Sequence, residues 1–191
     1  ARERNYVGNV DWVMSDITVT TSADQTPVAP GKVVSDRIEG DRRMVRFQST
    51  NPILGFFSIQ SADYSATKKQ HDGIELAIYH HPTHAFNAER MLDAMAVSLD
   101  YFQKNFGPYQ FDYARIIEFP GYASFAQAFA GTVPYSERIG FIANAADGND
   151  IDYVTYVTAH EYGHQYWAHQ LISAYTQGGT MLVETLSLIH I

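Results

Sequence analysis

Cysteine is absent from the 191 residues of the chain, which excludes disulfides, thiolate zinc sites and cysteine nucleophiles. Basic residues are also scarce: 13 Lys and Arg are outnumbered by 21 Asp and Glu, and the formal net charge is -8. Because no run of basic residues is present, we expect no nucleic-acid partner. No apolar run approaches the ~20 residues of a membrane-spanning helix, so we expect no membrane insertion by this segment.

Short alternating stretches in the first part of the chain predict β-strands. A turn at residues 39–41 joins two such stretches and predicts a hairpin, in which Val45 and Phe47 point inward. Strands are expected over residues 15–21, 32–38, 43–49, 55–60 and 74–79. We interpret residues 1–80 as a partial N-terminal β-sandwich domain.

Near Pro82 the apolar periodicity changes from that of strands to that of helices. An apolar stripe over residues 86–106 predicts a helix that Thr83 caps and that ends at Gly107-Pro108. Further elements are expected as strands over 113–119 and 138–143, and as helices over 150–169 and from Thr180. Strands and then helices, without a βαβ repeat, indicate the α+β class.

The sequence His160-Glu161-Tyr162-Gly163-His164 lies within the second predicted helix. Helical residues four apart lie one turn apart on the same face, so His160 and His164 can bind one tetrahedral Zn2+ ion. Glu161 then lies beside the open coordination position, where it can take a proton from water. Glycine is unfavourable inside a helix, so Gly163 indicates the close approach of another backbone or of a substrate.

A catalytic zinc site needs a third protein ligand in addition to one open position. Glu184 is the candidate, because it follows His164 by 20 positions and lies in a predicted helix. Two antiparallel helices joined by a loop would bring Glu184 beside the two histidines. Two imidazoles and one carboxylate form a hydrolytic arrangement, and Zn2+ is the expected cofactor.

These residues resemble those of the gluzincin metallopeptidases, and more narrowly the zinc aminopeptidase family typified by aminopeptidase N. Residues 15–79 resemble the later strands of that family's β-sandwich, and the resemblance continues in residues 105–109, 111–120, 135–137 and 164–167. It implies that residues 81–191 are the front part of a thermolysin-like zinc peptidase catalytic domain, truncated at its C-terminus, with peptides as substrates. The chain is similar to a bacterial subgroup joined to transporter-permease-like membrane segments, which implies a membrane-associated full-length protein in which this domain is soluble.

The chain departs from the family at the glutamate that holds the free amine of the substrate. Counted back from Glu137, the matching segment is Phe125-Ala126-Gln127-Ala128-Phe129, which has no acidic residue. We expect Gln127 and Glu137 to bind substrate, with Gln127 offering a hydrogen bond but no charge. Glu137 could instead support a zinc ligand or be a surface acid.

The family's transition-state tyrosine lies beyond the zinc glutamate, in a stretch that this sequence lacks. We therefore expect this segment to bind zinc but to hydrolyse peptides poorly. Two alternative functions stay open, namely a zinc-binding module that binds peptides or senses for a membrane transport protein without catalysis, and a protein without metal. His80, His81 and His84 form a further cluster, which predicts either a second metal site or a solvated turn.

Overall fold

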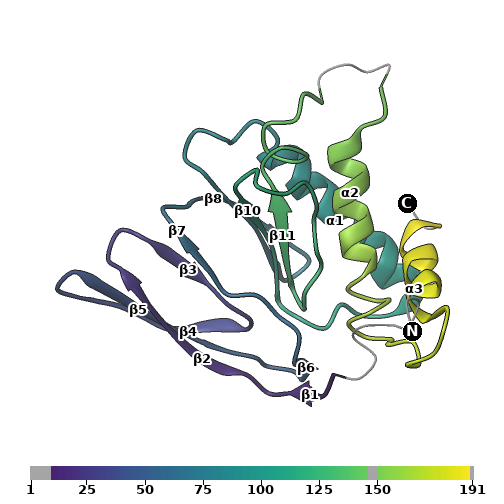
Figure 1. Cartoon of the computed structure of the whole chain (residues 1–191), viewed down its shortest axis with the longest axis horizontal. Coiled ribbons are helices and arrows are strands. Elements are labelled where there is room, and N and C mark those ends of the chain that lie inside the picture. Colours follow the sequence, from purple (N-terminus) through teal and green to yellow (C-terminus); the bar gives the residue numbers. More distant parts are fainter. Residues whose placement is uncertain (1–9, 146–149, 190–191) are drawn as a thin grey trace.

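The computed structural model describes residues 10–145 and 150–189, and Figure 1 shows their arrangement. The first nine elements along the described chain are strands, and the three helices among the described residues all come after residue 87. The chain is therefore of the mixed α+β class, as the sequence predicts. A mixed sheet with helices on one side forms one part of the molecule, and small antiparallel sheets form the other.

The larger sheet contains four strands and is joined to the first helix. Its elements are β8 (Ser65–His71), β9 (Ile74–His80), β10 (Tyr113–Phe119), β11 (Thr132–Ser136) and the helix α1 (Ala88–Phe106). The strand order is β11-β10-β9-β8. β8 and β9 form an antiparallel hairpin around Asp72 and Gly73, which have φ angles of 48° and 80°. β9, β10 and β11 are parallel to one another, and α1 connects β9 to β10.

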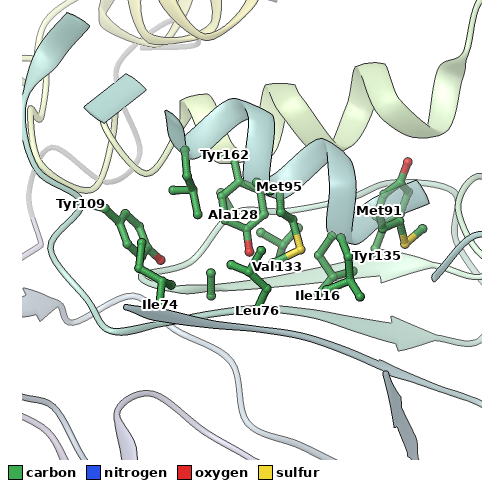
Figure 2. Packing of buried hydrophobic residues seen from close by; sticks show 14 of the residues in the cluster. Ile74, Leu76, Met91, Met95, Tyr109, Ile116, Ala128, Val133, Tyr135 and Tyr162 are labelled. Atoms are coloured by element: carbon green, nitrogen blue, oxygen red, sulfur yellow. The ribbon is translucent and has the colours of Figure 1, made fainter. Parts of the chain in front are cut away.

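The main apolar core lies between this sheet and α1. Figure 2 shows Met91 and Met95 of α1 beside Leu76, Ile116 and Val133 of the sheet, and all five side chains are fully buried. β10 is buried along its whole length, including its two charged residues, Arg115 and Glu118. This core holds α1 rigidly against the sheet and provides the support for the second helix, which packs on α1.

The smaller sheets lie in the N-terminal half. Their strands are β1 (Trp12–Val13), β2 (Asp16–Ser22), β3 (Thr26–Val28), β4 (Lys32–Glu39), β5 (Arg42–Gln48), β6 (Ile53–Leu54) and β7 (Gln60–Ala62). β2, β5 and β4 form an antiparallel sheet, while β1 pairs with β6 and β3 with β7. Val45 and Phe47 of β5 are buried, as predicted, in a small cluster with Ala29. The predicted hairpin between β4 and β5 is confirmed.

Two predicted strands are wrong. Residues 138–143 form turns, and the strand lies earlier, as β11. Pro134 and the small residues before it hide β11 in the sequence, although proline is tolerated there because β11 ends the sheet. Residues 55–59 have no regular structure, and only Gln60 of the predicted strand 55–60 belongs to one, as the start of β7.

The boundaries of two predicted helices also differ. α1 begins after Asn87, and Thr83 lies outside it. The amide of Asn87 donates instead to the carbonyls of Gly140 at 2.7 Å and Ala143 at 2.9 Å, which ties the turn after β11 to the start of α1. The helix predicted over 150–169 is shorter than expected at both ends. The parallel pairing of β9 and β10 around α1 is a βαβ unit, so the prediction of strands and then helices without such a unit is wrong here.

The predicted division of the chain at residue 80 stays a prediction. That position lies at the end of β9, which is paired with β10 in one sheet.

Among the described residues, no helix combines the length and the apolar character needed to cross a membrane.

Candidate metal centre

His160 lies in the last turn of α2 (Tyr153–Gly163) and His164 is the C-terminal cap of this helix, which begins at a well-formed N-terminal cap. A carboxylate oxygen of Asp152 accepts a hydrogen bond from the backbone N–H of Thr155 at 3.1 Å, and a second oxygen accepts from its hydroxyl at 2.7 Å. Val154 and Val157 of α2 are buried in the main core. His160 and His164 follow on one face at the end of α2, and their ring centres are 4.6 Å apart.

Glu184 reaches the pair from the third helix, α3 (Gly179–Leu188), which Figure 1 shows beside α2. Its Oε2 lies 3.4 Å from Nε2 of His160 and 3.3 Å from Nε2 of His164. The structure thus brings together the three predicted zinc ligands, whose nearest donor atoms all lie within 4.8 Å of one another.

Gly163 explains how the two helices come so close. A Cβ atom on Gly163 would lie 3.1 Å from the Cα and the carbonyl oxygen of Ser187 on α3. The close approach of another backbone, which the sequence predicted from this glycine, is therefore confirmed. Ser187 is fully buried at this contact.

Both imidazoles are held through their Nδ1 atoms. His164 Nδ1 lies 3.0 Å from the carbonyl oxygen of Trp167, which can only accept, so this nitrogen carries a proton. The hydroxyl of Ser187 donates to the carbonyl of Glu184 at 2.8 Å, so its oxygen is left to accept from Nδ1 of His160 at 3.0 Å. In their neutral forms the two rings therefore point unprotonated Nε2 atoms at the carboxylate, as the ligands of a metal ion would.

The electrostatics favour a positive charge among these three side chains. The two imidazoles lower the pKa of Glu184 far below its usual range, so its carboxylate is charged. Burial opposes protonation of His164, but Glu184, the Trp167 carbonyl and Glu161 outweigh it and raise the pKa of this histidine. Two unprotonated nitrogens and a carboxylate oxygen repel one another where they converge unless a cation lies between them. This set of ligand atoms fits Zn2+.

Glu161 is buried next to the three ligands, with 6% of its surface exposed. Burial raises its pKa above the usual value, His164 and His160 oppose this shift, and Glu184 adds to it. The backbone N–H of Ala128 donates to its carboxylate. A carboxylate with a raised pKa beside a metal site is suited to accept and return a proton.

Ala128 belongs to segment 125–129, which runs antiparallel along β11. Gln165, fully buried just after the motif, fixes this segment: its side chain accepts from the Gly131 N–H at 2.8 Å and donates to the Phe129 carbonyl at 2.9 Å. His169 Nε2 lies 3.0 Å from the Ala128 carbonyl, and burial lowers the pKa of His169 to about 4. Gln127 is therefore the residue just before Ala128, whose backbone N–H contacts Glu161.

Glu137 does not join the three ligands. Its carboxylate lies with His84 and Glu118 in a separate group. Two further residues at the site, Ser187 and Gln165, were not predicted from the sequence; they fix His160 and segment 125–129, respectively. A buried polar residue next to the motif is a weak signal for Gln165, but nothing in the sequence marks Ser187, because its role depends on the packing of α3 on α2.

No protein-family model matches the chain, and no curated protein matches it either.

Proposed function

We propose that this chain carries the catalytic site of a zinc-dependent metallopeptidase, related to the gluzincin aminopeptidases, that hydrolyses peptide bonds. One observation carries the proposal: His160, His164 and Glu184 converge on one point, and the buried carboxylate of Glu161 lies next to them. The end of a β-sandwich followed by a thermolysin-like catalytic domain is the finer fold that we propose with it.

Zn2+, when bound, polarises the scissile carbonyl group and lowers the pKa of water. Glu161 accepts the proton of the attacking water, because burial has raised the pKa of its carboxylate, and returns this proton to the leaving amine. The Ala128 N–H orients the carboxylate during both transfers. Ser187 and the Trp167 carbonyl keep Nδ1 of each histidine occupied, so that each Nε2 stays available as a ligand.

The peptide substrate would lie beside segment 125–129, which forms isolated β-bridges with β11 and places Ala128 next to Glu161. Gln127 on this segment has a neutral amide where an amine-binding carboxylate would provide charge. We therefore expect acetylation of the substrate amine to change kcat/KM only weakly.

The test compares the wild-type chain with Glu161→Gln in zinc content and in hydrolysis of internally quenched peptides. We expect both to bind zinc at the candidate centre, the wild-type chain to hydrolyse the peptides slowly, and the variant to lose this turnover by about 100-fold or more. Glu89→Gln, an exposed glutamate on α1, is the matched control and should retain activity.

Equal turnover of wild type and Glu161→Gln would exclude the peptidase. Zinc binding without turnover in either protein would favour the alternative, a non-catalytic peptide-binding or sensing module. A chain that binds no zinc at neutral pH would contradict both functions.

A further inference from the structure

A second group of metal-ligand side chains lies at the carboxyl ends of the three parallel strands. His84 follows β9, Glu118 is near the end of β10, and Glu137 comes directly after β11. Parallel strands end at the same edge of a sheet, which is the usual location of ligand sites in such sheets. The histidine cluster in the sequence is thus joined by two glutamates that the sequence does not place beside it.

The donor atoms of this group converge. Nδ1 of His84 lies 2.5 Å from Oε1 of Glu118 and 3.9 Å from Oε2 of Glu137. One ligand atom from each residue lies within 4.8 Å of the others. One imidazole nitrogen and two carboxylate oxygens therefore surround one point.

Each carboxylate is anchored by its other oxygen. Oε2 of Glu118 accepts from the backbone N–H of His81 at 2.6 Å, and Oε1 of Glu137 accepts from the backbone N–H of Gly121 at 2.6 Å. These bonds fix both carboxylates and leave one oxygen of each directed at His84. Backbone support of this kind is what orients the ligands of a metal ion.

The charges of the group are unbalanced. Only 5% of the Glu118 side chain and 26% of the Glu137 side chain are exposed. Among the described residues neither carboxylate forms an ion pair with lysine or arginine, although the side chain of Arg138 lies near Glu137 beside Gly121. Two carboxylates beside one imidazole, one of them nearly buried, favour the binding of a cation between them.

We propose that His84, Glu118 and Glu137 form a second metal site, which binds a divalent first-row transition ion such as Mn2+. The imidazole favours a transition ion over Mg2+ and Ca2+, and the two carboxylates suit Mn2+. The partial exposure of His84 and Glu137 leaves room for water as further ligands. Such an ion would join the ends of β9, β10 and β11 to the turn before α1.

This second site is separate from the candidate metal centre. The two groups share no residue: the three ligands of the candidate centre lie on or directly after α2 and on α3, whereas the second group lies at the ends of β9, β10 and β11. The second-site proposal therefore does not depend on the proposed peptidase activity.

The experiment first removes the candidate centre with a His160→Ala, His164→Ala double variant and then titrates the chain with Mn2+. Electron paramagnetic resonance counts the bound ions. We expect one Mn2+ per chain in this background, and a dissociation constant raised about 10-fold or more when either His84→Ala or Glu137→Gln is added. Added Mn2+ should raise the thermal unfolding temperature only while the second site is intact.

His71→Ala is the control, because His71 pairs with the single carboxylate of Asp100 at 2.6 Å and should not affect Mn2+ binding. If the double variant binds no Mn2+ at millimolar concentration, the group is only a histidine–carboxylate ion pair and the proposal is wrong. Equal binding with and without His84→Ala would also overturn it. If the double variant does not fold, wild type and His84→Ala are compared directly, and we expect the variant to bind one ion fewer.

Discussion

The two His/Glu groups of this molecule are made of the same side-chain types but are built in different ways. In the first, two ligands lie four residues apart on α2 and only Glu184 comes from another element. In the second, His84, Glu118 and Glu137 each lie at the end of a different strand. The first group therefore depends on the contact of two helices, and the second on the register of three parallel strands. Metal ligands can thus be brought together by one helical turn or by the pairing of strands that are distant in the sequence.

The largest effect that distinguishes the groups should come from Glu184→Ala. This change removes the one distant ligand of the first group, so zinc affinity should fall by about 100-fold or more, while Mn2+ binding at the second group stays unchanged. Competition with a chromophoric chelator measures the zinc affinity. An unchanged affinity would mean that the histidine pair alone binds the ion.

Ser187→Ala should have the next largest effect. It removes the acceptor for Nδ1 of His160, and zinc affinity should fall by about 10- to 100-fold. Thr185→Ala is a matched control, because the Thr185 hydroxyl donates to the Met181 carbonyl of the same helix at 2.7 Å and lies on its exposed side. Equal affinities for the two variants would show that the Ser187 contact does not orient the ligand.

Two glycines test the independence of the groups. A Cβ on Gly163 would press on the α3 backbone and displace Glu184, so Gly163→Ala should weaken zinc binding by about 10-fold. A Cβ on Gly121 would press first on the side chain of Arg138 and would lie 2.8 Å from Oε1 of Glu137, so Gly121→Ala should weaken binding only at the second group. Zinc titration of Gly163→Ala, and Mn2+ titration of Gly121→Ala in the His160→Ala, His164→Ala background, check this, and a glycine that affected both groups would contradict their separation.

The smallest effect concerns the cap of α2. Asp152→Ala should lower the free energy of unfolding by about 1 kcal/mol, while Asp150→Ala, at the start that the sequence predicted, should be nearly neutral. Burial acts to raise the pKa of Asp152, but hydrogen bonds from Thr155 and Arg90 outweigh it and lower the pKa.

This pKa gives the Asp152→Ala effect a pH dependence. Because the folded pKa is below the unfolded value of about 3.9, the contribution of Asp152 is complete above that pH and is lost as pH falls through the folded pKa. Urea unfolding at neutral pH and near pH 3 should show a smaller difference between wild type and variant at the lower pH. A difference that grew with acid would contradict this assignment.

The sequence was most informative where structure is local. The hairpin of β4 and β5, the inward side chains Val45 and Phe47, and α2 all follow from periodicity and turn chemistry. β11 was placed wrongly because its pairing with β10 depends on a partner distant in the chain, and Pro134 argues against a strand when only neighbours are considered. The apolar residues in 138–143 predicted a strand. In the structure their side chains pack beside α1, and their backbone forms turns.

The sequence by itself determined the spacing of His160, Glu161 and His164, since 3.6 residues per turn place the two histidines on one face of any helix that forms there. It also determined that Gly163 allows a close neighbour. Only the tertiary structure decided that this neighbour is Ser187, that Glu184 completes the group, and that Glu137 belongs with His84 and Glu118 instead. The physical reason is that helix geometry is fixed by adjacent residues, whereas helix docking and parallel strand register are fixed by how the whole core packs.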